Sequence, residues 1–299
     1  MPPTSVQRAM RHRAEELAAQ LPPLLVEAER VAITVSQGVH GRRRVGQGET
    51  FWQFRQYEPG EPAQRIDWRE SARSDRLYVR ETEWEASESV WIWRDSSPSM
   101  DYASGPDLPT KRARGDLVAL ALAALLIRGG ERVTLLGSGY PPATGMSVLN
   151  RLALVIERTD QPGTSLPAFE PLPRYGQLVM VSDLLSPLEE IDALARRFAS
   201  MGVKGHLLQV LDPVEETLPF EGRVRFEGLE SEADLLLSRV ETVRSQYTAR
   251  LQRHRDGLMA LTQSLGWTFA THRTDRATTT ALLALYGALA EPRRSLGGR

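Results

Sequence analysis

The chain has 299 residues, of which 41% are hydrophobic, 25% charged and 7% aromatic. This composition is that of a globular protein and excludes a disordered chain, collagen and a coiled-coil rod. The 37 basic and 38 acidic residues balance, so the protein as a whole does not attract DNA or an anionic membrane. Cysteine is absent, which excludes disulfides, thiolate zinc sites, iron–sulfur clusters and cysteine nucleophiles. A metal ion would therefore be bound by oxygen or by histidine. Nearly all cations are arginines, since the lysines are Lys111 and Lys204.

The first twenty residues are charged and helix-like, and they lack the apolar core of a signal peptide. The longest apolar run, 117–127, is much shorter than the roughly twenty residues that span a bilayer, and it predicts a buried helix. We therefore expect a cytoplasmic protein that does not span the membrane.

Short strands and turns are predicted from Val31 to Glu88, followed by an alternation of short apolar strands and longer helical patterns. This alternation is typical of a parallel sheet with crossover helices. Strands are expected at 90–93, 132–136, 178–181, 206–211 and 267–271, helices at 110–128, 147–159, 188–201, 233–265 and 278–289, and an edge or hairpin strand at 223–226. The predicted domains are 1–87, a helix plus a β-rich segment; 88–290, an α/β domain; and 291–299, a disordered tail.

Oxygen-bearing side chains follow several of these strands. Asp95, Ser97 and Ser99 come after the first strand, Thr164 lies in the loop after the helix at 147–159, and Asp183 follows the strand at 178–181. Ligands of open α/β sheets bind outside the carboxyl ends of the strands. Carboxylate and hydroxyl oxygens are the ligands that Mg²⁺ prefers. Asp95, Ser97, Ser99 and Thr164 are therefore candidate ligands, with Asp183 acting directly or through water.

An Asp-x-Ser-x-Ser string alone is a weak signal, and its position after a strand is what strengthens it. The alternative is that Ser97 and Ser99 cap the loop and Asp183 begins a turn. Because this site has so few anionic protein ligands, a bound ion would keep net positive charge and an open coordination position. Such an ion needs an external carboxylate or phosphate.

The same five residues match the metal-ion-dependent adhesion site of von Willebrand factor A-type domains. The preceding segment resembles the hallmark of domain-of-unknown-function family 58, a bacterial family with a von Willebrand A-like core whose members are typically encoded beside MoxR-type AAA+ ATPases. The matching motifs are Gly48-Glu49-x-Phe51, Arg55-x-Tyr57-x-Pro59-Gly60, Arg65-Ile66-Asp67-Trp68-x-x-Ser71-Ala72-Arg73 and Leu77-Tyr78-Val79-Arg80-Glu81. Glu61 departs from the family, which commonly has Asp there, but keeps the carboxylate.

The resemblance implies an α/β fold of the von Willebrand A (Rossmann-like) type, with a mostly parallel sheet and helices on both faces. It also implies a metal-dependent protein-binding adaptor that is not an enzyme. In this interpretation Mg²⁺ or Mn²⁺ occupies the site, and a Glu or Asp of a partner completes the octahedron. The expected partner is a MoxR-type AAA+ ATPase or a client protein that it remodels.

Two alternatives remain open. The segment Arg42–Arg80 mixes arginines, acids and aromatic residues, and we interpret it as an ion-paired structural segment or a protein-binding surface in preference to a nucleic-acid surface. The indole of Trp68 is expected to be a buried anchor. A Mg²⁺-dependent hydrolase of a phosphate or ester is the alternative function, although no Gly-x-Ser-x-Gly, Walker A or His-Glu-x-x-His motif is present.

Overall fold

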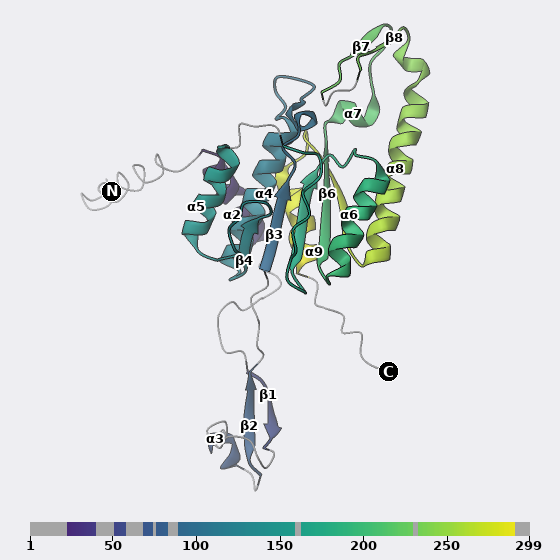
Figure 1. Cartoon of the computed structure of the whole chain (residues 1–299). Coiled ribbons are helices and arrows are strands. Elements are labelled where there is room, and N and C mark those ends of the chain that lie inside the picture. Colours follow the sequence, from purple (N-terminus) through teal and green to yellow (C-terminus); the bar gives the residue numbers. More distant parts are fainter. Residues whose placement is uncertain are drawn as a thin grey trace, which may run out of the picture. The chain divides into compact units, whose positions relative to one another are not determined.

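Figure 1 shows the computed structural model, which describes residues 23–39, 51–57, 68–73, 76–82, 89–158, 163–229 and 233–290. The chain divides into two compact units. One contains Met1–Gly41 and Glu88–Arg299, and the other is Arg42–Ser87. The charged stretch 1–20 and the predicted tail 291–299 lie outside the described residues.

The larger unit is built on a five-stranded sheet in which all strands are parallel. The strands lie in the order β4-β3-β5-β6-β9. Their bounds are β3 (Ser89–Arg94), β4 (Arg132–Leu135), β5 (Gln177–Ser182), β6 (Lys204–Leu211) and β9 (Thr268–Arg273). An isolated antiparallel bridge between Val133 and Ala143 extends the β4 edge. The predicted mostly parallel sheet is therefore confirmed, with boundaries that shift by a few residues.

Helices cover both faces of the sheet because successive strand residues point to opposite sides. Val90 and Ile92 of β3 join the core formed with α2 (Pro23–Val39), α4 (Lys111–Arg128), α5 (Met146–Glu157) and α9 (Thr278–Leu289). Trp91 and Trp93 join the core on the other face, formed with α6 (Leu188–Ser200) and α8 (Arg244–Leu265) (Figure 1). This architecture confirms the predicted α/β class, a mostly parallel sheet with helices on both faces.

Helix α4 is buried along most of its length, which explains its unbroken apolar run. It contacts the sheet through β3 and packs on α2 and α9. The hydroxyl of Thr110 caps the helix by accepting a hydrogen bond from the Ala113 amide, and Gly129 ends it. Cap, apolar run and terminal glycine are all readable in the sequence, and the predicted helix is confirmed.

The prediction of strands and turns from Val31 onward is wrong for the first residues of that stretch, because α2 continues to Val39. Ala28, Ala32 and Val35 are buried at helical spacing and pack in the same core as α4. The N-terminal helix therefore belongs to the α/β unit, whereas the predicted division grouped it with the β-rich segment. The apolar face of α2 is buried only because α4 and α9 complete it.

The predicted helix at 233–265 begins later than expected. Leu235–Leu237 forms β8, which pairs antiparallel with β7 (Val224–Phe226) and confirms the predicted hairpin strand. Val240 then enters the turn η3 (Val240–Thr242), is fully buried, and donates its amide hydrogen to the carbonyl of Gly222. These contacts hold the chain away from a helical path until α8 begins at Arg244.

In the smaller unit, β1 (Phe51–Gln56) and β2 (Tyr78–Thr82) pair antiparallel, and α3 (Trp68–Ser71) precedes β2. The predicted β-rich character is thus seen in its described part. Trp68, however, is 63% exposed, so the prediction of a buried indole is wrong. The buried residue of this helix is Ser71, whose hydroxyl accepts a hydrogen bond from the Tyr78 amide and so links α3 to β2.

Within residues 23–39 and the other described ranges, no helix has the length and apolar character needed to cross a bilayer.

Acid is expected to destabilise the fold through His206. Burial lowers the pKa of this histidine from 6.5 to about 4, with a further contribution from Lys204. The neutral ring donates from Nε2 to Gln177 Oε1 and accepts at Nδ1 from the Thr268 hydroxyl. Because the unfolded chain binds the proton first as pH falls, the free energy of unfolding decreases between about pH 6.5 and about pH 4. Urea denaturation of wild type and His206→Gln across this range should show a smaller loss in the variant, and equal losses would contradict the assignment.

Candidate metal centre

The topology of the sheet brings Asp95 and Asp183 together at the carboxyl ends of two neighbouring strands. β4 lies on one side of β3, whereas β5, β6 and β9 lie on the other, so the strand order reverses between β3 and β5. Crevices at such reversals, outside the carboxyl ends of the strands, are the usual ligand sites of open α/β sheets. Asp95 directly follows β3 and Asp183 directly follows β5. The geometry of the sheet therefore places both carboxylates at this reversal.

Asp95 is buried, and both its backbone amide and its carboxylate make hydrogen bonds. It is 1% exposed, and its amide donates to the Val181 carbonyl at 2.8 Å, which extends the β3–β5 pairing. Its carboxylate accepts hydrogen bonds from the Ser97 amide at Oδ1 (2.8 Å) and from the Ser182 hydroxyl at Oδ2 (2.7 Å). Burial raises the pKa of Asp95 above 3.8, and the charge of Asp183 adds to that rise. A cation near Asp95 would counter both effects.

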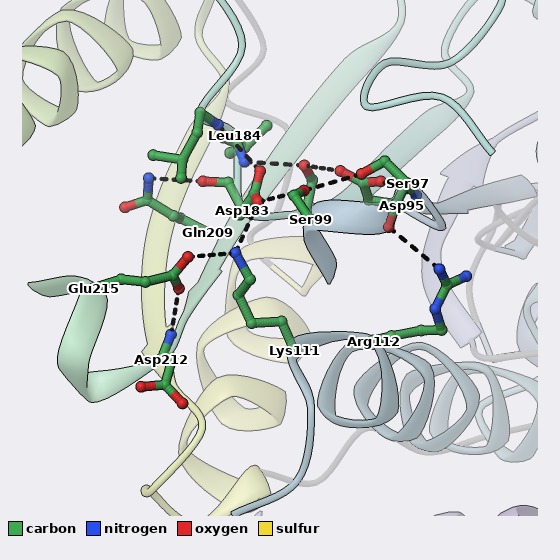
Figure 2. A network of polar contacts seen from close by, with 12 residues as sticks. Asp95, Ser97, Ser99, Lys111, Arg112, Asp183, Leu184, Gln209, Asp212 and Glu215 are labelled. Atoms are coloured by element: carbon green, nitrogen blue, oxygen red, sulfur yellow. Dashed lines mark hydrogen bonds and ion pairs between the residues drawn. The ribbon is translucent and has the colours of Figure 1, made fainter. Parts of the chain in front are cut away.

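The two serines connect the acidic residues. The turn η2 (Pro98–Asp101) folds the chain so that the hydroxyl oxygens of Ser97 and Ser99 lie 3.1 Å apart. The Ser99 hydroxyl donates to Asp183 Oδ2 at 2.8 Å (Figure 2). Four of the five predicted residues, Asp95, Ser97, Ser99 and Asp183, are therefore connected by one chain of hydrogen bonds, in which Asp95 is joined to Ser97 through the Ser97 amide.

The backbone around Asp183 is also fixed by hydrogen bonds. The next residue, Leu184, has a left-handed conformation (φ 51°), and its amide donates to the Ser182 hydroxyl. The amide of Leu185 donates to Asp183 Oδ1 at 3.2 Å, and Gln209 donates from Nε2 to the Asp183 carbonyl. A non-glycine residue in this conformation needs surrounding contacts to hold it there.

Thr164, the fifth predicted residue, lies differently. The amide of Gly163 donates to the Ser96 carbonyl at 2.9 Å, which brings this loop beside the serine loop. The Thr164 hydroxyl is nevertheless exposed and donates to the Leu166 carbonyl at 2.5 Å. The structure thus brings the loop to the site but directs this hydroxyl to its own backbone.

Replacing Thr164 by alanine should accordingly weaken Mn²⁺ binding less than replacing Ser99 does. Ser99 contacts both Ser97 and Asp183, so its loss removes a donor from the centre of the site and should cost about tenfold or more in affinity. Isothermal titration of the two variants makes the comparison. An equal loss in Thr164→Ala would show that Thr164 turns its hydroxyl toward the ion.

The structure adds to the site one residue that the sequence did not predict there, Lys111. It is 1% exposed, and its ammonium group lies 2.9 Å from Asp183 Oδ2 and 2.6 Å from Glu215 Oε1 (Figure 2). Burial lowers the pKa of Lys111, but the two carboxylates outweigh burial, and the net result is a raised pKa. A signal was present in the sequence: lysine is rare in this arginine-rich chain, and a compact ammonium suits a closed site that a guanidinium would not fit.

Arg112, the next residue of α4, supports the serine loop. Its guanidinium donates to the Ser97 carbonyl at 3.2 Å (Figure 2), and it also forms an ion pair with Asp101. The side-chain hydrogen bond with Asp101 raises the pKa of Arg112, with burial opposing it. The first turn of α4 therefore holds both halves of the site, Asp183 through Lys111 and Ser97 through Arg112.

The oxygen set fits a hard divalent cation in its chemistry. Asp95, Ser97, Ser99 and Asp183 present carboxylate and hydroxyl oxygens, the donors that suit Mg²⁺ or Mn²⁺. Over the described part of the chain, no group of three or more acidic or histidine side chains is arranged to hold a metal. A cation at Asp95 would therefore depend on the serine hydroxyls, on water and on a ligand from outside the chain.

Residues 53–257 match the family described as "Protein of unknown function DUF58". The chain belongs to the DUF58 family. Similar curated proteins are "Uncharacterized protein Rv1480" of Mycobacterium tuberculosis and "Uncharacterized protein Mb1516" of Mycobacterium bovis. Each is 26% identical over 279 residues, which cover 87% of this chain and 86% of the relative. The family assignment confirms the predicted membership, and the names of these relatives state no activity.

Two solved structures are also similar to this DUF58 protein. One is an aerotolerance-related membrane protein from Bacteroides fragilis, with 15% identity, a TM-score of 0.41, and coverage of 68% of this chain and 98% of that one. The other is the conserved hypothetical protein BatB from Bacteroides thetaiotaomicron, with 14% identity, a TM-score of 0.40, and coverage of 69% and 100%.

Proposed function

We propose that this protein is a divalent-metal-dependent protein-binding adaptor without enzymatic activity of its own. Asp95, Ser97, Ser99 and Asp183 would hold Mg²⁺ or Mn²⁺, with Thr164 as a further candidate ligand. The ion would supply an electrophilic position for a Glu or Asp side chain of a partner. The observation that carries the proposal is the convergence of Asp95, the two serine hydroxyls and Asp183 at the reversal of the sheet order.

A carboxylate ligand suits this site better than a neutral one. The set has two carboxylates, of which Asp183 is already paired with Lys111, so a divalent ion bound there keeps part of its positive charge. An external anion completes the coordination and compensates that charge. The hydroxyls and backbone amides meanwhile hold the oxygen atoms in place without adding negative charge.

The proposed partner is a MoxR-type AAA+ ATPase, or a client protein that it remodels, in a cytoplasmic assembly. The support for this partner is the resemblance of the family segment and the DUF58 membership. The Arg42–Ser87 unit, with its exposed Trp68, is a candidate second contact for the same partner. Exposed tryptophan and arginine residues are common at the centres of protein interfaces.

The test is capture of a purified MoxR-type ATPase from the same organism by the immobilised full-length chain. Capture should require Mg²⁺ and be lost on chelation. It should be unchanged in Asp192→Ala, which removes a partly exposed acidic residue of α6 that pairs with Arg196. Binding that is equally strong with a chelator would overturn the metal-dependent mechanism.

The hydrolase alternative has its own test. Purified protein with Mg²⁺ is expected to turn over neither generic phosphate nor generic ester substrates. Turnover that disappears in Asp183→Ala would favour a metal-dependent hydrolase, because a metal and an acidic residue in one polar site can activate water.

A further inference from the structure

We propose that Lys111 sets the cation affinity of the Asp95 site: its ammonium group opposes binding of a divalent ion, and Glu215 weakens that opposition by sharing the ammonium. This inference rests on the proposed function, because it concerns the same ion. It assigns to Lys111 an electrostatic role, in which the ammonium group competes with the ion for Asp183 Oδ2.

Lys111 occupies an unfavourable position for a lysine, both in α4 and in its burial. It is the first residue of the helix, where the helix dipole disfavours positive charge. It is also 1% exposed, and lysines are almost never fully buried unless they are paired. Burial at an electrically unfavourable position is tolerated here because Asp183 and Glu215 both contact the ammonium group.

Asp183 Oδ2 is the oxygen at which the two cations would compete. This atom accepts hydrogen bonds from the Ser99 hydroxyl at 2.8 Å and from the Lys111 ammonium at 2.9 Å. The ammonium therefore lies next to the Ser99–Asp183 part of the predicted ligand set. A like charge at such a distance lowers the affinity of the site for a second cation.

Glu215 is held in place from two sides. It lies in the short helix α7 (Pro213–Thr217), and its Oε2 accepts a hydrogen bond from the Asp212 amide, which closes a capping box. Its carbonyl accepts a hydrogen bond from the Tyr247 hydroxyl at 2.6 Å. Glu215 thus offers Lys111 a fixed second carboxylate, which draws the ammonium charge partly away from Asp183.

Two variants are expected to shift Mn²⁺ affinity in opposite directions. Lys111→Met removes the opposing charge at similar side-chain length, so Mn²⁺ should bind about tenfold more tightly or better. Glu215→Gln leaves the ammonium to Asp183 alone and removes a nearby negative charge, so Mn²⁺ should bind more weakly. Isothermal titration of full-length protein with MnCl₂ measures both.

The matched control is Lys204→Met, which removes an exposed lysine at the opposite end of β6 and should leave the affinity unchanged. Weaker or unchanged binding in Lys111→Met would overturn the inference. Weaker binding would mean that Lys111 is needed to hold Asp183 in place for the ion, and unchanged binding would mean that the ammonium charge does not act on the ion. If the loss of a buried ion-pair partner prevents Lys111→Met from folding, the comparison becomes Lys111→Met/Glu215→Gln against Glu215→Gln. The double variant should bind Mn²⁺ more tightly.

Failure of the inference and failure of the proposed function give different results. If wild type binds no Mn²⁺ in an Asp95-dependent manner, the metal-dependent function is wrong. If wild type binds Mn²⁺ through Asp95 but Lys111→Met binds no more tightly than Lys204→Met, the assignment of Lys111 alone is wrong.

Discussion

Replacement of Asp95 by alanine is expected to abolish Mn²⁺ binding and Mg²⁺-dependent capture of the partner. Asp95 is the carboxylate in the set that no lysine or arginine contacts within hydrogen-bond distance in the described structure, so it supplies the strongest attraction for a cation. The fold should survive. Burial raises the pKa of Asp95, so the native state disfavours its charged form, and removal of that charge offsets part of the cost of losing the hydrogen bonds from Ser97 and Ser182.

Asp95→Asn is the stricter version of this experiment. Asparagine keeps the shape of the side chain and an oxygen that can accept from the Ser97 amide, but it removes the charge. Circular dichroism and the thermal midpoint should match wild type without metal, whereas titration with MnCl₂ should detect no binding at this site. A variant that folds and still captures the partner in a Mg²⁺-dependent manner would exclude Asp95 as a ligand.

The largest loss of stability is expected from Gly205→Ala in β6. A Cβ atom at this position would lie 2.0 Å from the ring of Trp267, far inside any possible contact distance. The ring cannot swing away easily, because Trp267 is buried and its indole N–H donates to the Val203 carbonyl at 3.1 Å. Overpacking of this kind costs on the order of 3 kcal/mol, to be measured as a decrease in the free energy of unfolding in urea.

Gly287→Ala is the matched control for that substitution. Gly287 lies within α9, and a Cβ atom there would meet nothing within 4 Å. Alanine in place of a helical glycine should raise the free energy of unfolding by about 0.5–1 kcal/mol. Two Gly→Ala changes of opposite sign would show that β6 and Trp267 are in contact as described, whereas a neutral Gly205→Ala would contradict that packing.

The parts of the fold that sequence reasoning predicted well are those with a local signal. Helix α4 has a threonine cap, an apolar run and a terminal glycine, and its predicted range matches the structure closely. The strands of the sheet are short apolar runs, since both faces of a parallel sheet are buried. Asp95 and Asp183 were found because each directly follows such a strand, and the ends of parallel strands meet at one edge.

The errors come from contacts made between distant segments. The extension of α2 to Val39 depends on α4 and α9, which cover its apolar face. The leucines of β8 fit a helical spacing with those of α8. The pairing of β8 with β7 and the burial of Val240 nevertheless stabilise a hairpin in place of a longer helix. Periodicity describes one segment at a time, so it cannot choose between two structures that are stabilised by different partners.

By itself the sequence determined the type of fold, the family, and the oxygen-bearing residues that the strand ends bring together. Only the tertiary structure decided how these residues are used. It directs the Thr164 hydroxyl to Leu166, and it places the ammonium of Lys111 between Asp183 and Glu215, residues far apart in the chain. The physical reason is that charge interactions depend on distance in space and on burial, neither of which is encoded in local residue patterns.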